Sequence, residues 1–276
     1  MDGVSVGSTT AMLSVVTAPL AAVGGVCLKT LREFGRIGIF FVRGVLGVFS
    51  VPVQFAKFLS QVYFIGAKSV LVICLTGAFT GMVLGLQGYY TLVKFGAKGM
   101  LGAAVALSLI RELGPVLTAI MVTARAGSAM SAEIGIMRIS EEIDALKTMD
   151  INPIRFLVSP RIVAAVISFP LLTAIFDVIG ILGGYLSGSL MLGLSSGTFF
   201  SRVTSSVEMQ DVTGGFSKSV VFGLVVATIS CYEGYYTHTR PEGFGAKGVS
   251  SSTTSAVVIC CVLILVTDYV MTSFLL

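Results

Sequence analysis

Four ionisable side chains lie inside apolar stretches of this sequence, where they could do chemistry. Arg111 and Glu112 are adjacent in one stretch, and Asp177 and Asp268 lie in two later ones. Charge within a membrane is costly unless it is paired or solvated, so such residues are candidates for function. The Arg–Glu pair could be a structural ion pair or a contact for a lipid head group, and the aspartates could be packing or cavity-wall residues. We take all four as substrate-path candidates.

A catalytic reading of these carboxylates remains as an alternative. Two aspartates could serve an intramembrane hydrolase, or the charged residues could form a proton relay. Neither Asp177 nor Asp268 stands in a recognisable motif, and general acid–base catalysis depends on a geometry that the sequence does not supply. We therefore expect no catalytic residue and a non-enzymatic protein.

The composition predicts an all-α polytopic membrane protein. The chain has 276 residues, of which 55% are hydrophobic and 12% charged, and its mean hydropathy is +0.96. Soluble domains carry about 25% charged residues. A helix needs about 20 apolar residues to cross the bilayer core. The predicted spans cover residues 65–87, 100–124, 156–192, 216–236 and 255–276. Arg125 is expected to mark the end of the second span.

Other classes of site are excluded by missing motifs. The sequence has no GxxxxGK[ST] phosphate loop and no GxSxG nucleophile elbow. Its five cysteines lack CxxC spacing and its single histidine cannot complete a metal site with them. Basic residues form no clustered nucleic-acid-binding face. We expect this chain to bind no metal, cofactor or nucleic acid.

The N-terminal part divides into two segments. Residues 1–30 form a poorly specified arm without the charged start of a signal peptide. In residues 31–64, basic side chains alternate with phenylalanines, which predicts an amphipathic helix at the membrane surface. Residues 31–276 are expected to form one domain.

Small residues mark where helices approach one another. Gly77, Gly81 and Gly85 recur every fourth residue of the first span and form a smooth ridge. The ridge could pack within the chain or across a subunit interface. Gly114 and Pro115 interrupt the second span, where proline frees a carbonyl and can kink the helix.

A short acidic helix is predicted over residues 139–151, between the second and third spans. Ser140 is its expected N-cap, acids favour the positive end of its dipole, and Asn152-Pro153 ends it. Thirteen Lys and Arg residues lie on the side of the membrane that holds this helix, against four on the other. The basic excess belongs in the cytoplasm, so the N-terminus and this helix are cytoplasmic and the C-terminus lies outside.

Such a helix has a specific use in a chain without a nucleotide site. It can lie in a groove of a separate ATPase and carry motion to the spans, since acids fit an anionic membrane surface poorly. The expected contact residues are Ser140, Glu141, Glu142, Ile143, Asp144, Leu146, Lys147 and Met149.

Three motifs resemble one known family. Residues 109–119 (LIRELGPVLTA), residues 124–135 (ARAGSAMSAEIG) and residues 142–146 (EIDAL), followed by Asn152-Pro153 and Ser159-Pro-Arg161, are similar to the MlaE (YrbE) permeases. The span pattern from residue 31 onward is similar too, whereas residues 1–30 have no counterpart.

The resemblance implies a permease subunit of an ABC lipid transporter in the bacterial inner membrane. It implies a homodimer, two ATPase subunits on the coupling helices and a hexamer of MCE-domain proteins on the periplasmic side. ATP and magnesium would then be bound by the ATPase. Phospholipid would pass through a cavity near Arg111 and Glu112, which would maintain outer-membrane lipid asymmetry or homeostasis. A stand-alone channel or carboxylate-dependent enzyme is the alternative.

Overall fold

The computed structural model describes residues 28, 31–48, 55–239 and 245–275, and these residues are almost entirely helical, with no strand among them. Five of the described helical stretches are long and apolar enough to cross a membrane, which confirms the predicted all-α, five-span fold. They cover Ala56–Lys94, Lys98–Ile139, Ile154–Met191, Met209–Tyr235 and Gly245–Leu275. Apart from Leu28, the N-terminal arm lies outside the described residues.

A helix over residues 31–48 precedes the spans, and its part up to residue 42 belongs to a unit separate from the rest. Within that part, Glu33 and Arg36 form an ion pair of 3.0 Å one turn apart. Phe34 and Ile39 are more than half exposed on the same helix. The position of this helix at the membrane surface, expected from its mixture of charged and apolar side chains, stays a prediction.

The first span consists of α2 (Phe55–Ile65), a single 3-10 turn (Ala67–Ser69) and α3 (Val70–Lys94). Arg125 fills the break between the two helices, because its guanidinium donates to the carbonyl of Phe64 and to the Ser69 hydroxyl, both at 2.7 Å. The helix continues past Arg125 to Ile139, and the membrane boundary expected at Arg125 stays a prediction.

The second span belongs to one helical stretch that runs from the 3-10 turn at Lys98–Met100 to Ile139. It is built from α4 (Leu101–Ser108), a π turn (Leu109–Leu113), α5 (Gly114–Val122), a second π turn (Thr123–Gly127) and α6 (Ser128–Ile139). Arg111 and Glu112 lie on the first π turn and Arg125 on the second. Single π turns inside α-helices are often found at functional sites.

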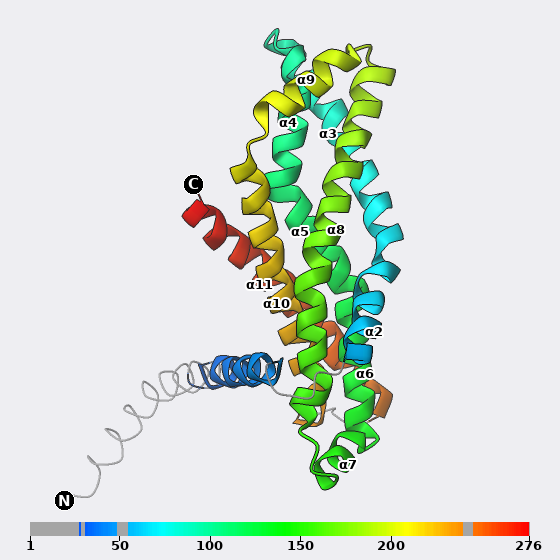
Figure 1. Ribbon diagram of the computed structural model, residues 1–276, viewed down its shortest axis with the longest axis vertical. Helices are drawn as coiled ribbons and strands as arrows, with labels where there is room; N and C mark the ends of the chain where they lie inside the picture. The colour runs from blue at the N-terminus through cyan, green and yellow to red at the C-terminus, as the bar shows by residue number, and fades with distance from the viewer. Residues whose placement is uncertain (1–27, 29–30, 49–54, 240–244, 276) are drawn as a thin grey trace, which may run out of the picture. The chain divides into compact units, whose positions relative to one another are not determined.

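The remaining described elements complete the bundle. They are a π turn (Ile154–Val158), α8 (Ser159–Tyr185), a π turn (Leu186–Met191), α9 (Ser196–Ser206), α10 (Met209–Tyr235), a 3-10 turn (Thr237–Thr239) and α11 (Gly245–Leu275). Helix α8 is central, because it packs against α2, α3, α5 and α10. The short helix α7 (Glu142–Thr148) lies at one end of the bundle and α9 lies at the other (Figure 1).

The glycine ridge of α3 packs against α8 of the same chain. A Cβ atom on Gly81 would collide with the backbone of Gly180, and one on Gly85 would collide with Ser187 and the backbone of Gly184. Gly77 lies against Phe176 in the same way. Backbone-to-backbone approach of this kind is what small residues permit between membrane helices.

Candidate functional site

Lys218 of α10 lies at the centre of a charged cluster inside the bundle. Its side chain is 3% exposed, and its ammonium group contacts the Glu112 carboxylate at 2.7 Å and the Asp268 carboxylate at 3.1 Å. It also donates to the Thr272 hydroxyl at 2.7 Å. The structure thus brings Glu112 and Asp268 together through Lys218, which lies inside the predicted span at residues 216–236 but is not among the candidate residues expected from the sequence.

The backbone near Arg111 completes the coordination of this lysine. In a regular helix the amide of residue 115 would donate to the carbonyl of residue 111, but Pro115 has no N–H to give. The Arg111 carbonyl instead accepts a hydrogen bond of 3.0 Å from the Lys218 ammonium. Pro115 therefore leaves the Arg111 carbonyl free to accept a hydrogen bond from the buried Lys218 ammonium.

Arg111 forms the outer part of the same cluster. Its Nε donates to Asp211 at 2.7 Å, and the second oxygen of Asp211 accepts from the backbone amide of Glu208 at 3.0 Å. Glu208 and Asp211 form a capping box at the start of α10. The start of this helix is thereby fixed against the π turn that carries Arg111.

A cavity of about 270 Å³ opens beside these residues. It is lined by Arg111, Glu112, Glu208, Gln210, Asp211, Gly214, Gly215, Lys218, Thr272 and Leu275. Nearly half of the Arg111 side chain and 42% of the Glu112 side chain remain exposed. The cavity thus presents a guanidinium and a carboxylate side by side, which suits a polar group carrying both signs of charge.

Asp177 is the one substrate-path candidate that lies apart from this cluster. It is 8% exposed on α8 and packs directly against Gly114, where a Cβ atom would collide with its carboxylate. Asp268 contacts Lys218 instead, so the described contacts give the two aspartates no common partner. The arrangement does not favour an aspartate-pair hydrolase. The described residues also contain no group of three metal-binding side chains.

Helix α7 is shorter than the predicted acidic helix and begins differently. It spans Glu142–Thr148, and Ser140 is the C-cap of α6 rather than the N-cap of α7. Glu141 occupies the N-cap position with a φ of 61°, in the left-handed region. The reason is that α6 continues to Ile139, so the chain must reverse within two residues.

Charged contacts hold α7 against the end of α6. Asp144 accepts from Arg138 at 2.9 Å and from Lys147 at 2.7 Å. These hydrogen bonds, first from Lys147 and then from Arg138, lower the pKa of Asp144 below its usual value. Arg138 also donates to Nδ1 of His238 at 2.9 Å. Burial, with the Arg138 charge as a second cause, lowers the pKa of His238 below 6.5.

The apolar side chains of α7 and of the residue after it differ in their burial. Ile143 is fully buried, Leu146 is half-buried and Met149 is 68% exposed. Glu141 and Glu142 are also exposed. The tip of the α6–α7 hairpin therefore presents two carboxylates and one large apolar side chain, which is a chemistry suited to protein contact.

Sequence comparison identifies relatives over nearly the whole chain. The family described as "Permease MlaE" matches residues 58–274. A probable ABC transporter permease protein of Rickettsia bellii is 41% identical over 91% of this chain and 95% of its own length. The intermembrane phospholipid transport system permease protein MlaE of Haemophilus influenzae is 39% identical over 92% of this chain and 96% of its own length. The chloroplast protein trigalactosyldiacylglycerol 1 of Arabidopsis thaliana is 35% identical over 83% of this chain and 64% of its own length. This five-span chain belongs to the MlaE permease family.

Proposed function

We propose that this chain is the permease subunit of an ABC transporter that moves phospholipid. The observation that carries the proposal is the cavity around Lys218, which lies inside a permease-family bundle and presents Arg111 and Glu112 together. A guanidinium suits a lipid phosphate and a carboxylate suits a lipid amine. The names of the Rickettsia and Haemophilus relatives, an ABC transporter permease and a phospholipid transport permease, support the same function.

The helical stretch from Lys98 to Ile139 gives the transporter a way to couple its two ends. Glu112 and Ile139 are 27 residues apart on this stretch, which is about 40 Å at 1.5 Å per residue. Helix α7 follows directly after a two-residue turn. A movement imposed on α7 would therefore reach the charged cavity along one continuous helix.

The proposed partners rest on membership of the MlaE permease family and on the exposed acidic tip of α7. ATP would be hydrolysed by a separate ATPase subunit that receives the acidic tip of α7 in the cytoplasm. A second copy of this chain would complete the lipid path, and a ring of MCE-domain proteins would accept or deliver lipid on the periplasmic side. Such a complex in the inner membrane would contribute to outer-membrane lipid asymmetry, with the C-terminus of this chain in the periplasm.

Reconstitution tests this function directly. The chain would be purified with its ATPase and MCE partners, placed in liposomes with fluorescent phospholipid and followed for transfer to an external acceptor. We expect transfer that requires ATP and is lost when Glu112 is changed to Lys while the complex stays assembled. Transfer by the chain alone, without an ATPase or ATP, would instead support a stand-alone channel.

A further inference from the structure

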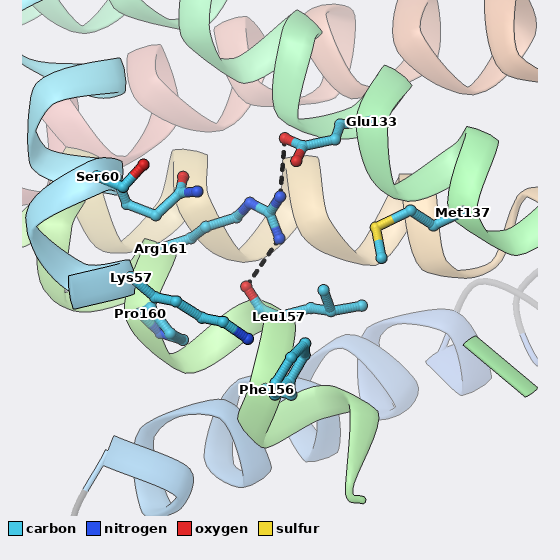
Figure 2. Close-up of a pocket in the computed structure, with 9 residues that line it drawn as sticks. Lys57, Ser60, Glu133, Met137, Phe156, Leu157, Pro160 and Arg161 are labelled. Atoms are coloured by element: carbon cyan, nitrogen blue, oxygen red, sulfur yellow. Dashed lines mark hydrogen bonds and ion pairs between the residues drawn. The ribbon is translucent and has the colours of Figure 1, made fainter. Parts of the chain in front are cut away.

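A second cavity, of about 230 Å³, lies at the α7 end of the spans (Figure 2). Helix α2 contributes Lys57 and Gln61, α6 contributes Glu133, and the π turn before α8 and α8 itself contribute Phe156 and Arg161. None of these residues belongs to the Lys218 cluster.

The cavity contains cationic groups whose hydrogen-bonding capacity is not filled. Arg161 is 3% exposed. Its two terminal nitrogens contact Glu133 at 2.8 Å and the Leu157 carbonyl at 2.9 Å, while its Nε is buried without a hydrogen-bond partner. Figure 2 shows the Arg161 guanidinium held between these two oxygens. Buried donors are almost always satisfied in folded proteins, so this one points to a ligand.

Lys57 provides the second cationic group that lacks a hydrogen-bond partner. Its ammonium nitrogen is buried without a hydrogen-bond partner and lies 2.7 Å from the centroid of the Phe156 ring. The Gln61 carbonyl oxygen is also buried without a partner, and a rotation of that amide would present its NH₂ group instead. One carboxylate, Glu133, faces two cations, so the cavity has an excess of positive charge.

The position of the cavity indicates where its ligand comes from. Lys57 is the second residue of the first span, Arg161 the eighth residue of the third, and Glu133 lies six residues before the end of the second. These spans are 38 to 42 residues long, whereas the bilayer core takes about 20. The surplus length leaves part of each helix end outside the hydrocarbon, and we place this cavity, near the α7 ends of three such helices, at the level of the lipid head groups.

We propose that this cavity binds the phosphate of a phospholipid from the leaflet on the α7 side. Lys57 and the Nε of Arg161 donate to the phosphate oxygens, while Glu133 keeps its ion pair with the terminal nitrogen of Arg161. The site is distinct from the Lys218 cavity, and it does not depend on the proposed transport function. A lipid bound here would lie between α2 and the end of α6, next to the helix that leads into α7.

Counting bound lipid tests the proposal. The full chain would be purified, stripped of lipid and titrated with dioctanoyl phosphatidylglycerol, dioctanoylglycerol or inorganic phosphate, and native mass spectra would give the lipids bound per chain. Lys57→Met removes one donor without leaving a carboxylate unpaired. We expect it to weaken one phosphatidylglycerol site at least tenfold, and Lys57→Arg to restore that site. Diacylglycerol binding should not change.

The matched control is Lys68→Met, since Lys68 is an exposed lysine eleven residues further along the same span and does not line the cavity. It should leave the phosphatidylglycerol site intact. Equal phosphatidylglycerol binding by the wild-type chain and Lys57→Met would overturn the proposal. Displacement of the lipid by inorganic phosphate at equal concentration would overturn the assignment to lipid and leave a free-phosphate site. Lipid transfer by Glu112→Lys, measured in parallel, tests the proposed transport cavity separately from this site.

Discussion

The ammonium of Lys218 on α10 donates to the main-chain carbonyl of Arg111, 107 residues earlier in the chain. This carbonyl is available because Pro115, four residues later, has no amide hydrogen to occupy it. A proline in one span and a lysine in another thus form a single structural unit. The unit also holds Glu112 and Asp268.

Removal of the lysine should destabilise the bundle. Lys218→Met leaves Glu112 and Asp268 without their cation. Breaking a fully buried ion pair costs about 3–5 kcal/mol. Because the Glu112 side chain is 42% exposed, water can replace part of the contact, and we expect a loss on the order of 2 kcal/mol. Thermal unfolding in detergent measures it, with the exposed Lys94→Met as the control that should leave the melting temperature unchanged.

Introducing an amide N–H at residue 115 should weaken the contact between Lys218 and the Arg111 carbonyl. Pro115→Ala returns an N–H that competes with Lys218 for the Arg111 carbonyl. We expect lower lipid transfer at nearly unchanged stability, because the alanine favours the helix while the cluster loses one hydrogen bond worth about 1.5–3 kcal/mol. Transfer equal to wild type would show that the lysine does not need this carbonyl.

Charge reversal at the tip of α7 should remove the ATPase. Glu141→Lys with Glu142→Lys changes two exposed carboxylates and leaves the Asp144 ion pairs intact. We expect co-purification of the ATPase to fall at least tenfold while the chain elutes normally in detergent. The charge reversal Lys98→Glu, at the opposite end of the same helical stretch, serves as the control. Undiminished co-purification by the double variant would exclude this contact.

The α6–α7 hairpin should loosen in mild acid. His238 has a pKa below its ordinary value of 6.5 in the folded protein, through burial and then through Arg138. Protonation therefore favours the undocked state, so the contribution of His238 is complete above about pH 6.5 and is lost progressively below it. Asp144 has a pKa below 3.8 and stays ionised in this range. The protection of the α7 amides, corrected for the slower intrinsic exchange at low pH, should fall between pH 8 and 5.5 in the wild type and change less in His238→Gln.

The contact between α3 and α8 should tolerate no side chain at its centre. Gly81→Val places its Cβ against the backbone of Gly180, which cannot move aside without separating the helices. We expect a loss of about 3 kcal/mol or more, or no folded protein. Gly197→Ala, whose Cβ would meet only the Ser195 hydroxyl at 3.9 Å, should be tolerated. A folded Gly81→Val protein with normal thermal stability would contradict this packing.

Much of the fold could be predicted because it depends on composition and spacing. Apolar length alone identified five spans, and the four-residue glycine spacing identified the face of α3 that approaches another helix closely. Three of four charged candidates proved to be neighbours in one cluster. A charge inside a span can be recognised in the sequence, since the membrane makes it expensive.

The rest required three-dimensional contacts. Lys218 falls inside the predicted span at residues 216–236, but its partners Glu112, Asp268, Thr272 and the Arg111 carbonyl lie far away in the sequence and could not be recognised from it. A lysine three residues into an apolar stretch was the available signal. Arg125 was taken as the residue at which the second span leaves the membrane, and its contacts with Phe64 and Ser69 inside the bundle could not be recognised from the sequence. Ser140 matched an N-cap by type, but α6 extended far enough to use it as a C-cap.

The two π turns between Ser108 and Ser128 have a consequence for insertions and deletions. Each π turn holds one residue more than an α-helical turn, so removing one residue there would restore α geometry and leave the helix faces on either side nearly in register. Removing one residue from an α-helical part of the same stretch would instead rotate everything after it by about 100°. A single-residue deletion in α4, α5 or α6 would therefore aim a chemically unchanged α7 at the wrong side, whereas a deletion at either π turn would not.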